Sequence, residues 1–240
     1  MQRKKAPTRG VVARPGAAGR ARVDGARLTR FQRALLRWYA RHGRDLPWRR
    51  TRDPYAILVS ETMLQQTQVA RVLEYYPRFL RRYPTVEALA VATPTAVRES
   101  WDGLGYYRRA VNLRRTAALV AERHGGRFPA DLAALQSLPG IGRYTAGAVA
   151  AFAFGQDAPI LDTNAARVLS RVFGPGRRRG RTRRLWALAE RAIPTGRGYA
   201  FNQAIMDLGA LVCRARRPAC PACPVRRACG TFERMASAQR

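Results

Sequence analysis

The chain has 240 residues, of which 47% are hydrophobic, and its 45 lysines and arginines against 15 acids give a formal net charge of +30. This length predicts one large domain or two interlocked small ones with a sizeable core. The charge predicts a polyanionic partner, and nucleic acid is the obvious candidate. No run approaches the ~20 apolar residues that span a membrane, and the N-terminus lacks the apolar segment of a secretory signal. We therefore expect a cytoplasmic, nucleoid-associated protein that has no membrane partner.

The only lysines are Lys4 and Lys5, so the globular part of the chain contains none. A P-loop, which needs Gly-Lys-Ser/Thr, is excluded on this ground. Catalysis through a Schiff base on a core lysine is excluded as well.

Residues 1–30 contain nine basic residues and one acid, with glycine, alanine and proline among them. This composition predicts a disordered basic arm that adds non-specific attraction for DNA. A wrongly assigned start codon is the alternative. Folded structure is expected to begin near Leu28.

Apolar residues at helical spacing predict an all-α fold, because no stretch alternates as a strand would. The expected helices cover residues 28–43, 55–72, 75–82, 86–91, 95–102, 108–124, 131–138, 144–154, 164–173, 183–193 and 201–213. Short loops rich in glycine and proline join them.

In the helix expected over residues 55–72, Glu61 shares a face with Ile57, Leu58 and Leu64. A carboxyl group on an apolar face is costly unless it is paired, and its desolvation raises the pKa. A raised pKa suits a general acid near neutral pH. A buried glutamate paired with an arginine is an equally good interpretation.

Two short stretches combine amides, aromatic rings and turn glycines: residues 65–67 (QQT) and residues 103–107 (GLGYY). A base pulled from a duplex leaves a gap that needs a wedge, and its orphaned partner needs hydrogen bonds. Both stretches could supply these groups. Core packing of the tyrosines is the alternative.

Residues 138–147 contain the most distinctive turn of the chain. Pro139 and Gly140 end one helix, and Gly142 permits a tight reversal into the next. The pattern predicts a helix-hairpin-helix whose free backbone N–H groups, at a helix N-terminus, would bind a phosphate. An ordinary connection between helices is the alternative.

Asp162 follows two apolar residues and directly precedes a helix. The simplest interpretation is an N-cap. An aspartate there could also hold a carboxylate against a developing cation. Together with Glu61 it would supply two carboxyl groups in different environments, which is the usual equipment for cleaving a glycosidic bond through an oxocarbenium-like state.

All four cysteines, Cys213, Cys220, Cys223 and Cys229, fall within seventeen residues. In a cytosolic protein this favours a metal site over disulfides. Their spacing leaves zinc and a [4Fe-4S] cluster open. Five arginines lie among and beside them, so we expect the loop to contact phosphates.

Six motifs occur in order: residues 46–49 (LPWR), 60–69 (SETMLQQTQV), 103–107 (GLGYY), 138–142 (LPGIG), 160–164 (ILDTN) and the cysteine loop. From about residue 31 to residue 229, the chain resembles the helix-hairpin-helix DNA glycosylases of the endonuclease III superfamily. The second and third motifs look like the MutY-type adenine glycosylases within it, rather than their thymine-removing relatives.

This resemblance implies a six-helix barrel domain over residues 46–156, which carries the helix-hairpin-helix. It implies a second helical domain, from residues 31–45 and 157–240, that holds a [4Fe-4S] cluster on the four cysteines. The implied partner is double-stranded DNA with a mispaired base, which we expect the protein to bind as a monomer.

The resemblance also implies roles for single residues. Glu61 would protonate a flipped adenine and later help to activate water, and Asp162 would stabilise the sugar cation. Tyr144 and Asn164 would support that site. The implied DNA contacts are Arg44, Trp48 and Arg49 at the adenine; Gln65, Gln66, Thr67, Leu104 and Tyr106 at the opposite base and the gap; and Gly140, Gly142 and Arg143 at the hairpin, where a monovalent cation is implied.

Tyr144 stands where bifunctional relatives carry a Schiff-base lysine, so a monofunctional glycosylase is expected. The predicted reaction is hydrolysis of the N-glycosidic bond of adenine opposite 8-oxoguanine or guanine. Full-length MutY proteins read 8-oxoguanine with a C-terminal NUDIX-like domain, whereas this chain stops eleven residues after Cys229, which leaves the opposite-base preference open.

Two other functions stay as alternatives. Thymine/uracil–guanine mismatch glycosylases of the superfamily are also short and can carry a tyrosine at this position. A non-catalytic helix-hairpin-helix DNA-binding protein would not need both Glu61 and Asp162.

Overall fold

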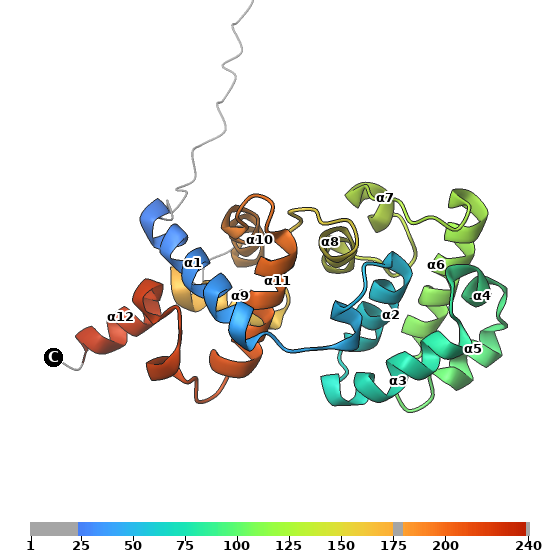
Figure 1. Cartoon of the computed structure of the whole chain (residues 1–240), viewed down its shortest axis with the longest axis horizontal. Helices are drawn as coiled ribbons and strands as arrows, with labels where there is room; N and C mark the ends of the chain where they lie inside the picture. Colours follow the sequence, from blue (N-terminus) through green and yellow to red (C-terminus); the bar gives the residue numbers. More distant parts are fainter. Residues whose placement is uncertain (1–23, 175–179, 239–240) are drawn as a thin grey trace, which may run out of the picture.

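The computed structural model describes residues 24–174 and 180–238. All regular elements of this part are helical, which confirms the predicted all-α fold (Figure 1). No helix in it is both long and apolar enough to cross a membrane. The α-helices are α1 (Gly25–His42), α2 (Pro54–Leu64), α3 (Val69–Arg82), α4 (Val86–Val91), α5 (Pro94–Ser100), α6 (Arg108–His124), α7 (Leu132–Gln136), α8 (Arg143–Phe152), α9 (Thr163–Phe173), α10 (Arg181–Ala192), α11 (Gly198–Asp207) and α12 (Gly230–Ser237).

The first helix begins earlier than the sequence predicted. Asp24 caps α1 by accepting a hydrogen bond from the backbone N–H of Ala26 at 3.0 Å. Residues 25–30 are therefore helical, which corrects the C-terminal end of the predicted basic arm. The rest of that arm, residues 1–23, lies outside the described residues.

A second correction concerns the single helix predicted over residues 55–72. It is two helices, because α2 ends at Leu64 and α3 begins at Val69. Gln66 between them has a φ of +57°, a left-handed conformation that interrupts a right-handed helix. Two further features of the C-terminal part were not predicted: helix α12, and a π-helical turn over Leu208–Val212 that continues α11.

The buried apolar side chains of the described residues fall into two groups. One group runs from Leu46 to Ile160, and we call this part the barrel lobe. The other combines Phe31 and Leu35 of α1 with residues 165–228, and we call it the cysteine lobe. In Figure 1 the chain passes from α1 into the barrel lobe and returns through α8 to α9. The two cores support the predicted domain boundaries, which stay a prediction.

Helix α8 contacts α11 of the cysteine lobe and also runs past the extended segment that leads into α9. A Cβ atom on Gly147 would lie 2.5 Å from the carbonyl oxygen of Pro159, so only glycine allows this approach. On its other side α8 packs against α2. Residues of α2, of α8 and of the start of α9 are thereby brought to one place between the lobes.

Candidate active site

Glu61 lies in the most deeply buried helix of the barrel lobe. Every residue of α2 from Tyr55 to Met63 is buried, and Glu61 is only 4% exposed. Burial is the main cause that raises the pKa of Glu61, to about 7, and a hydrogen bond with the Tyr144 hydroxyl opposes this rise. The negative charge of Asp162 raises the pKa further, whereas the positive charge of Arg49 lowers it. Its buried Oε2 atom has no hydrogen-bond partner among the described residues. A large share of the carboxyl group is therefore protonated near neutral pH, and one of its oxygens is available.

Tyr144 stands beside Glu61 at the start of α8. Burial, followed by the nearby charges of Glu61 and Asp162, raises the pKa of the tyrosine well above its ordinary value of 10.0. Its hydroxyl lies 3.9 Å from the sulfur of Met206, a weak acceptor. Tyr144 is thus a neutral hydroxyl facing two carboxyl groups.

Asp162 caps α9 and is half-buried. Its side chain accepts a hydrogen bond from the backbone N–H of Ala165 at 2.6 Å and another from Asn164 Nδ2 at 2.8 Å. Asn164 Oδ1 in turn accepts from Arg167 at 2.6 Å. The N-cap interpretation is therefore correct, and it does not compete with a role near Glu61. The structure brings together all four residues predicted to be catalytic.

The segment between α1 and α2 carries Arg44, Trp48 and Arg49. The two arginines share a partner that the sequence did not reveal. Asp207, at the end of α11, is fully buried. Both terminal nitrogens of Arg49 donate to its two carboxylate oxygens at 2.8 Å, and Arg44 adds its backbone N–H and its Nε. Burial opposes ionisation of Asp207, but these hydrogen bonds keep its pKa below the ordinary value. Trp48 is buried with its ring edge-on to Tyr76.

The two stretches predicted to contact the gap and the opposite base form neighbouring loops. Gln66 is exposed and left-handed, and Tyr106, with a φ of +49°, is 61% exposed. Gln65 Nε2 reaches the hydroxyl of Thr145 at 3.5 Å. Leu104 is only 5% exposed and belongs to the barrel core, so its side chain does not lie on the surface as a wedge would.

A single buried arginine joins these two loops. Arg109, at the start of α6, is 9% exposed, and it is not paired with any carboxylate in the described part of the chain. Its two terminal nitrogens donate to the carbonyl oxygens of Thr62, Met63, Gln65, Leu104 and Gly105 and to the hydroxyl of Thr67. This guanidinium therefore ends α2 and fixes the loops that carry Gln66 and Tyr106.

Replacing Arg109 by methionine is expected to lower the free energy of unfolding by about 3 kcal/mol or more, because each buried carbonyl left without a donor costs ~1–3 kcal/mol. Arg109→Lys should lie between wild type and Arg109→Met, since an ammonium lacks the planar fork. Urea unfolding measures the change, and Arg108→Met, an exposed neighbour, is the matched control. An Arg109→Met protein as stable as Arg108→Met would contradict this assignment.

The hairpin between α7 and α8 has the predicted form. Gly140 has a φ of +75°, and a Cβ atom there would lie 2.8 Å from the Cβ of Asn112. Thr116 donates its hydroxyl to the carbonyl oxygen of Pro139 at 2.8 Å. Gly142 caps α8 without a side chain, so no side-chain oxygen competes for the first N–H groups of that helix. Exposed Arg143 stacks on Trp186, with its guanidinium carbon 4.1 Å from the ring centroid.

The four cysteines line one pocket of about 220 Å³ in the cysteine lobe. Arg171 donates a hydrogen bond to the sulfur of Cys213 at 3.3 Å. Four cysteine sulfurs around one cavity are the donor set of an iron–sulfur cluster, so the residues fit such a cluster.

Residues 59–191 match the family model of the HhH-GPD superfamily base excision DNA repair proteins. The chain is 45% identical over 228 residues to the human adenine DNA glycosylase, covering 90% of this chain and 42% of that protein. It is 44% identical over 199 residues to the adenine DNA glycosylase of Mycobacterium tuberculosis, covering 80% of this chain and 64% of that protein.

Among solved structures, a thermostable thymine-DNA glycosylase superposes with a TM-score of 0.82 at 34% identity and covers 87% of this chain and 98% of its own. An endonuclease III–DNA complex superposes with a TM-score of 0.77 at 23% identity, covering 90% of this chain and 99% of its own, and shares the fold. The chain spans less than half of the human protein. The match to the family model covers more than half of this chain, and the chain belongs to the HhH-GPD superfamily of base excision DNA repair proteins.

Proposed function

We propose that this protein is a monofunctional DNA glycosylase that hydrolyses the N-glycosidic bond of a mispaired adenine in double-stranded DNA. The observation that carries the proposal is the pairing of Glu61, buried with a pKa of about 7, with the capped carboxylate of Asp162. Similarity to the adenine glycosylases supports adenine as the base.

In the proposed reaction, Glu61 donates its proton to a ring nitrogen of the flipped adenine. The bond between the sugar and the base then breaks, and its electron pair leaves with the adenine. The carboxylate of Asp162 stabilises the cation that develops on the sugar. Glu61, now ionised, accepts a proton from the attacking water and is ready for another cycle.

The other residues bind and orient the DNA. Exposed Gln66 and Tyr106 would fill the gap and contact the opposite base, held in place by Arg109. The first N–H groups of α8 would bind a phosphate, with a monovalent cation as the proposed bridge at the hairpin. Arg49, held in place by Asp207, would place its positive charge beside the adenine.

A thymine/uracil–guanine mismatch glycosylase is the second candidate, because a thymine-DNA glycosylase is similar over nearly its whole length. Single-turnover base release from four duplexes distinguishes the two: adenine opposite 8-oxoguanine, adenine opposite guanine, thymine opposite guanine and uracil opposite guanine. We expect release of adenine without strand cleavage. Release of thymine or uracil alone would overturn the proposal in favour of the second candidate.

The rate of base release is expected to fall as the pH rises through about 7, because the reaction needs Glu61 in its protonated form. Below that pH the acid is already protonated, so the rate should level off. Single-turnover rates between about pH 5 and pH 9 measure the profile. A rate that does not change across this range would exclude Glu61 as the acid.

We infer that the four cysteines hold a [4Fe-4S] cluster, which would cross-link residues 213–229 and stabilise them as one loop. The freshly purified protein should then be brown and contain iron, and Cys220→Ser should lose both the colour and thermal stability. Visible absorption and an iron assay measure the first effect, and thermal unfolding measures the second. A colourless protein with bound zinc would refute the inference.

A further inference from the structure

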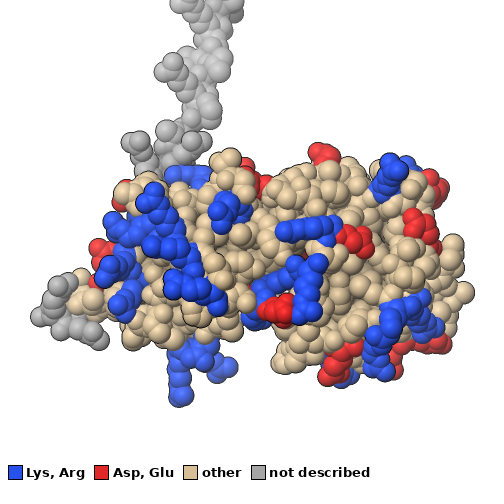
Figure 2. Space-filling model, in the orientation of Figure 1, with Lys and Arg blue, Asp and Glu red and all other residues tan. Residues whose placement is uncertain are grey.

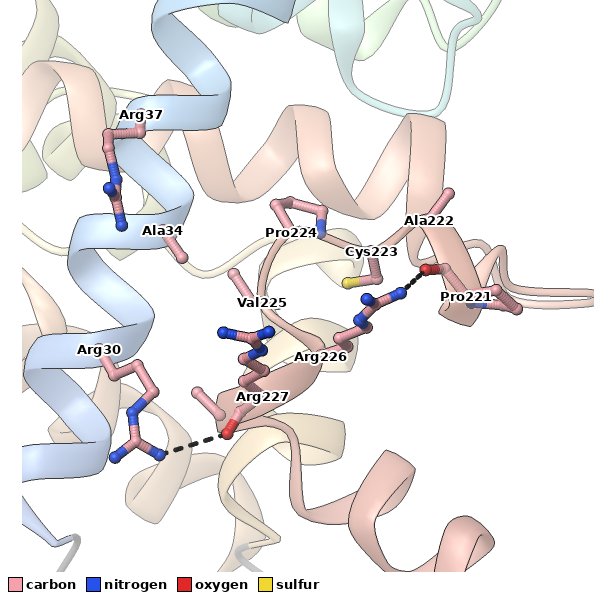
Figure 3. A pocket seen from close by; sticks show the side chains of 11 residues that line it. Arg30, Ala34, Arg37, Pro221, Ala222, Cys223, Pro224, Val225, Arg226 and Arg227 are labelled. Carbon is pink, nitrogen blue, oxygen red and sulfur yellow. Dashed lines mark hydrogen bonds between the residues drawn. The ribbon is translucent and has the colours of Figure 1, made fainter.

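The cysteine lobe carries a basic groove outside the candidate active site. The groove has a volume of about 700 Å³ and lies between α1 and the loop at residues 221–228 (Figure 3). Arg30 and Arg37 line it from α1, and Arg226 and Arg227 line it from the opposite wall. Figure 2 shows basic side chains gathered over α1 on this face of the molecule.

No carboxylate of the described residues forms an ion pair with these four arginines. None of them is in an ion pair in the described part of the chain, where the neighbouring Arg27 pairs with Glu233 at 3.6 Å. The residues outside the described part contain no aspartate or glutamate at all. Arg30 donates across the groove to the carbonyl oxygen of Arg227 at 3.4 Å, and Arg226 donates to that of Pro221. The acceptors of Arg30 and Arg226 are thus neutral carbonyl oxygens.

Apart from Cys223, the rest of the lining is apolar and comes from both walls: Ala34 of α1, and Pro221, Ala222, Pro224, Val225 and Ala228 of the loop. Phosphates of a nucleic acid would neutralise the arginines but would gain nothing from an apolar surface. A peptide that carries both acidic and apolar side chains uses both features. Arg30 and Arg37 are two helical turns apart, about 10 Å along the axis, which matches a short peptide segment.

We propose that this groove is a docking site for an acidic peptide segment of a partner protein, with apolar side chains among its carboxylates. The sequence alone suggested phosphate contacts for the cysteine loop. The apolar lining of the groove favours a peptide for Arg226 and Arg227. The site is separate from Glu61 and Asp162, so the proposal does not depend on which base is removed.

The test uses the whole protein and the fluorescently labelled peptide Glu-Glu-Leu-Glu-Leu-Glu-Glu, followed by fluorescence anisotropy. The affinity of the protein for this peptide should fall at least about tenfold in the double variant Arg30→Glu/Arg37→Glu, since two attractive charges become repulsive. The matched control is Arg115→Glu/Arg123→Glu, which makes the same charge change on exposed positions of α6, a helix that does not line the groove. It should change the affinity less than about threefold.

Three further results bear on the proposal. A peptide with both leucines replaced by serine should bind more weakly, because it cannot use the apolar lining. Arg226→Glu/Arg227→Glu should repeat the loss from the opposite wall, and circular dichroism checks that each variant is folded. Equal losses in the groove and control variants would overturn the proposal in favour of non-specific attraction. Displacement of the peptide by a fully paired duplex would assign the groove to DNA.

Discussion

Replacing Glu61 by glutamine is expected to reduce base release at least about a thousandfold, the upper range for loss of one general acid–base group. Glutamine keeps the shape of the side chain but has no proton of suitable pKa to donate. Affinity for mismatched duplex should stay within about threefold of wild type, since the glutamine amide can still donate a hydrogen bond to the base. Single-turnover excision and a gel-shift titration measure the two effects.

The same substitution should stabilise the fold at alkaline pH. Burial raises the pKa of Glu61 from an ordinary 4.5 to about 7, so the folded state binds the proton more tightly than the unfolded state. The wild-type protein therefore loses stability as the pH rises between these values, by about 3 kcal/mol in total. Glutamine has no charge to bury and avoids this loss.

The control for both effects is Glu99→Gln, an exposed glutamate on α5. It should change neither the excision rate nor the pH dependence of unfolding. If Glu61→Gln released adenine at the wild-type rate, Glu61 would be a structural residue, and another group would have to protonate the base.

Replacing Asp207 by alanine is expected to destabilise the protein by about 3–5 kcal/mol, the usual cost of removing one partner of a buried ion pair. The change leaves the guanidinium of Arg49 buried without its carboxylate, and Arg44 loses the same partner. Urea unfolding measures the loss. Asp207→Asn, which keeps one of the two acceptor oxygens, should lose less.

This substitution should also change the chemistry of Glu61 without touching it. Arg49 already lowers the pKa of Glu61, and an Arg49 without Asp207 would attract that carboxylate more strongly. The pH at which base release declines should therefore move downward in Asp207→Asn. A profile identical to that of wild type would show that Asp207 only stabilises the fold.

Sequence reasoning predicted Glu61 and Asp162 because each interrupts a local pattern: an acid on an apolar face, and an acid at a helix start. Asp207 interrupts an apolar helix in the same way, between Met206 and Leu208, and the same signal would have found it. Its pairing with Arg49 could not be predicted, since it joins residues 158 positions apart in the chain.

Arg109 gave no signal, because it is one of many arginines and its importance comes from carbonyl groups of two distant loops. The break between α2 and α3 was missed for the same reason. The helical spacing of apolar residues continues past Gln66, so this spacing predicts one unbroken helix. Only the contact with Arg109 shows where α2 ends. The helix boundaries that local residues set, such as that of α6 at its C-terminal glycine, were predicted correctly.

The division of the apolar core has a consequence for how the chain folds during synthesis. The barrel lobe is continuous in sequence, so it is complete soon after its last helix leaves the ribosome. Phe31 of α1 must instead wait for Phe173 of α9 and Phe201 of α11, whose ring centroids lie 5.3 Å and 6.2 Å away. Until these helices are made, the apolar face of α1 lacks the partners that bury it in the cysteine lobe, which exposes it to association with other chains. The slow step of folding is therefore expected to be the return of α1 to the cysteine lobe, after the barrel has formed.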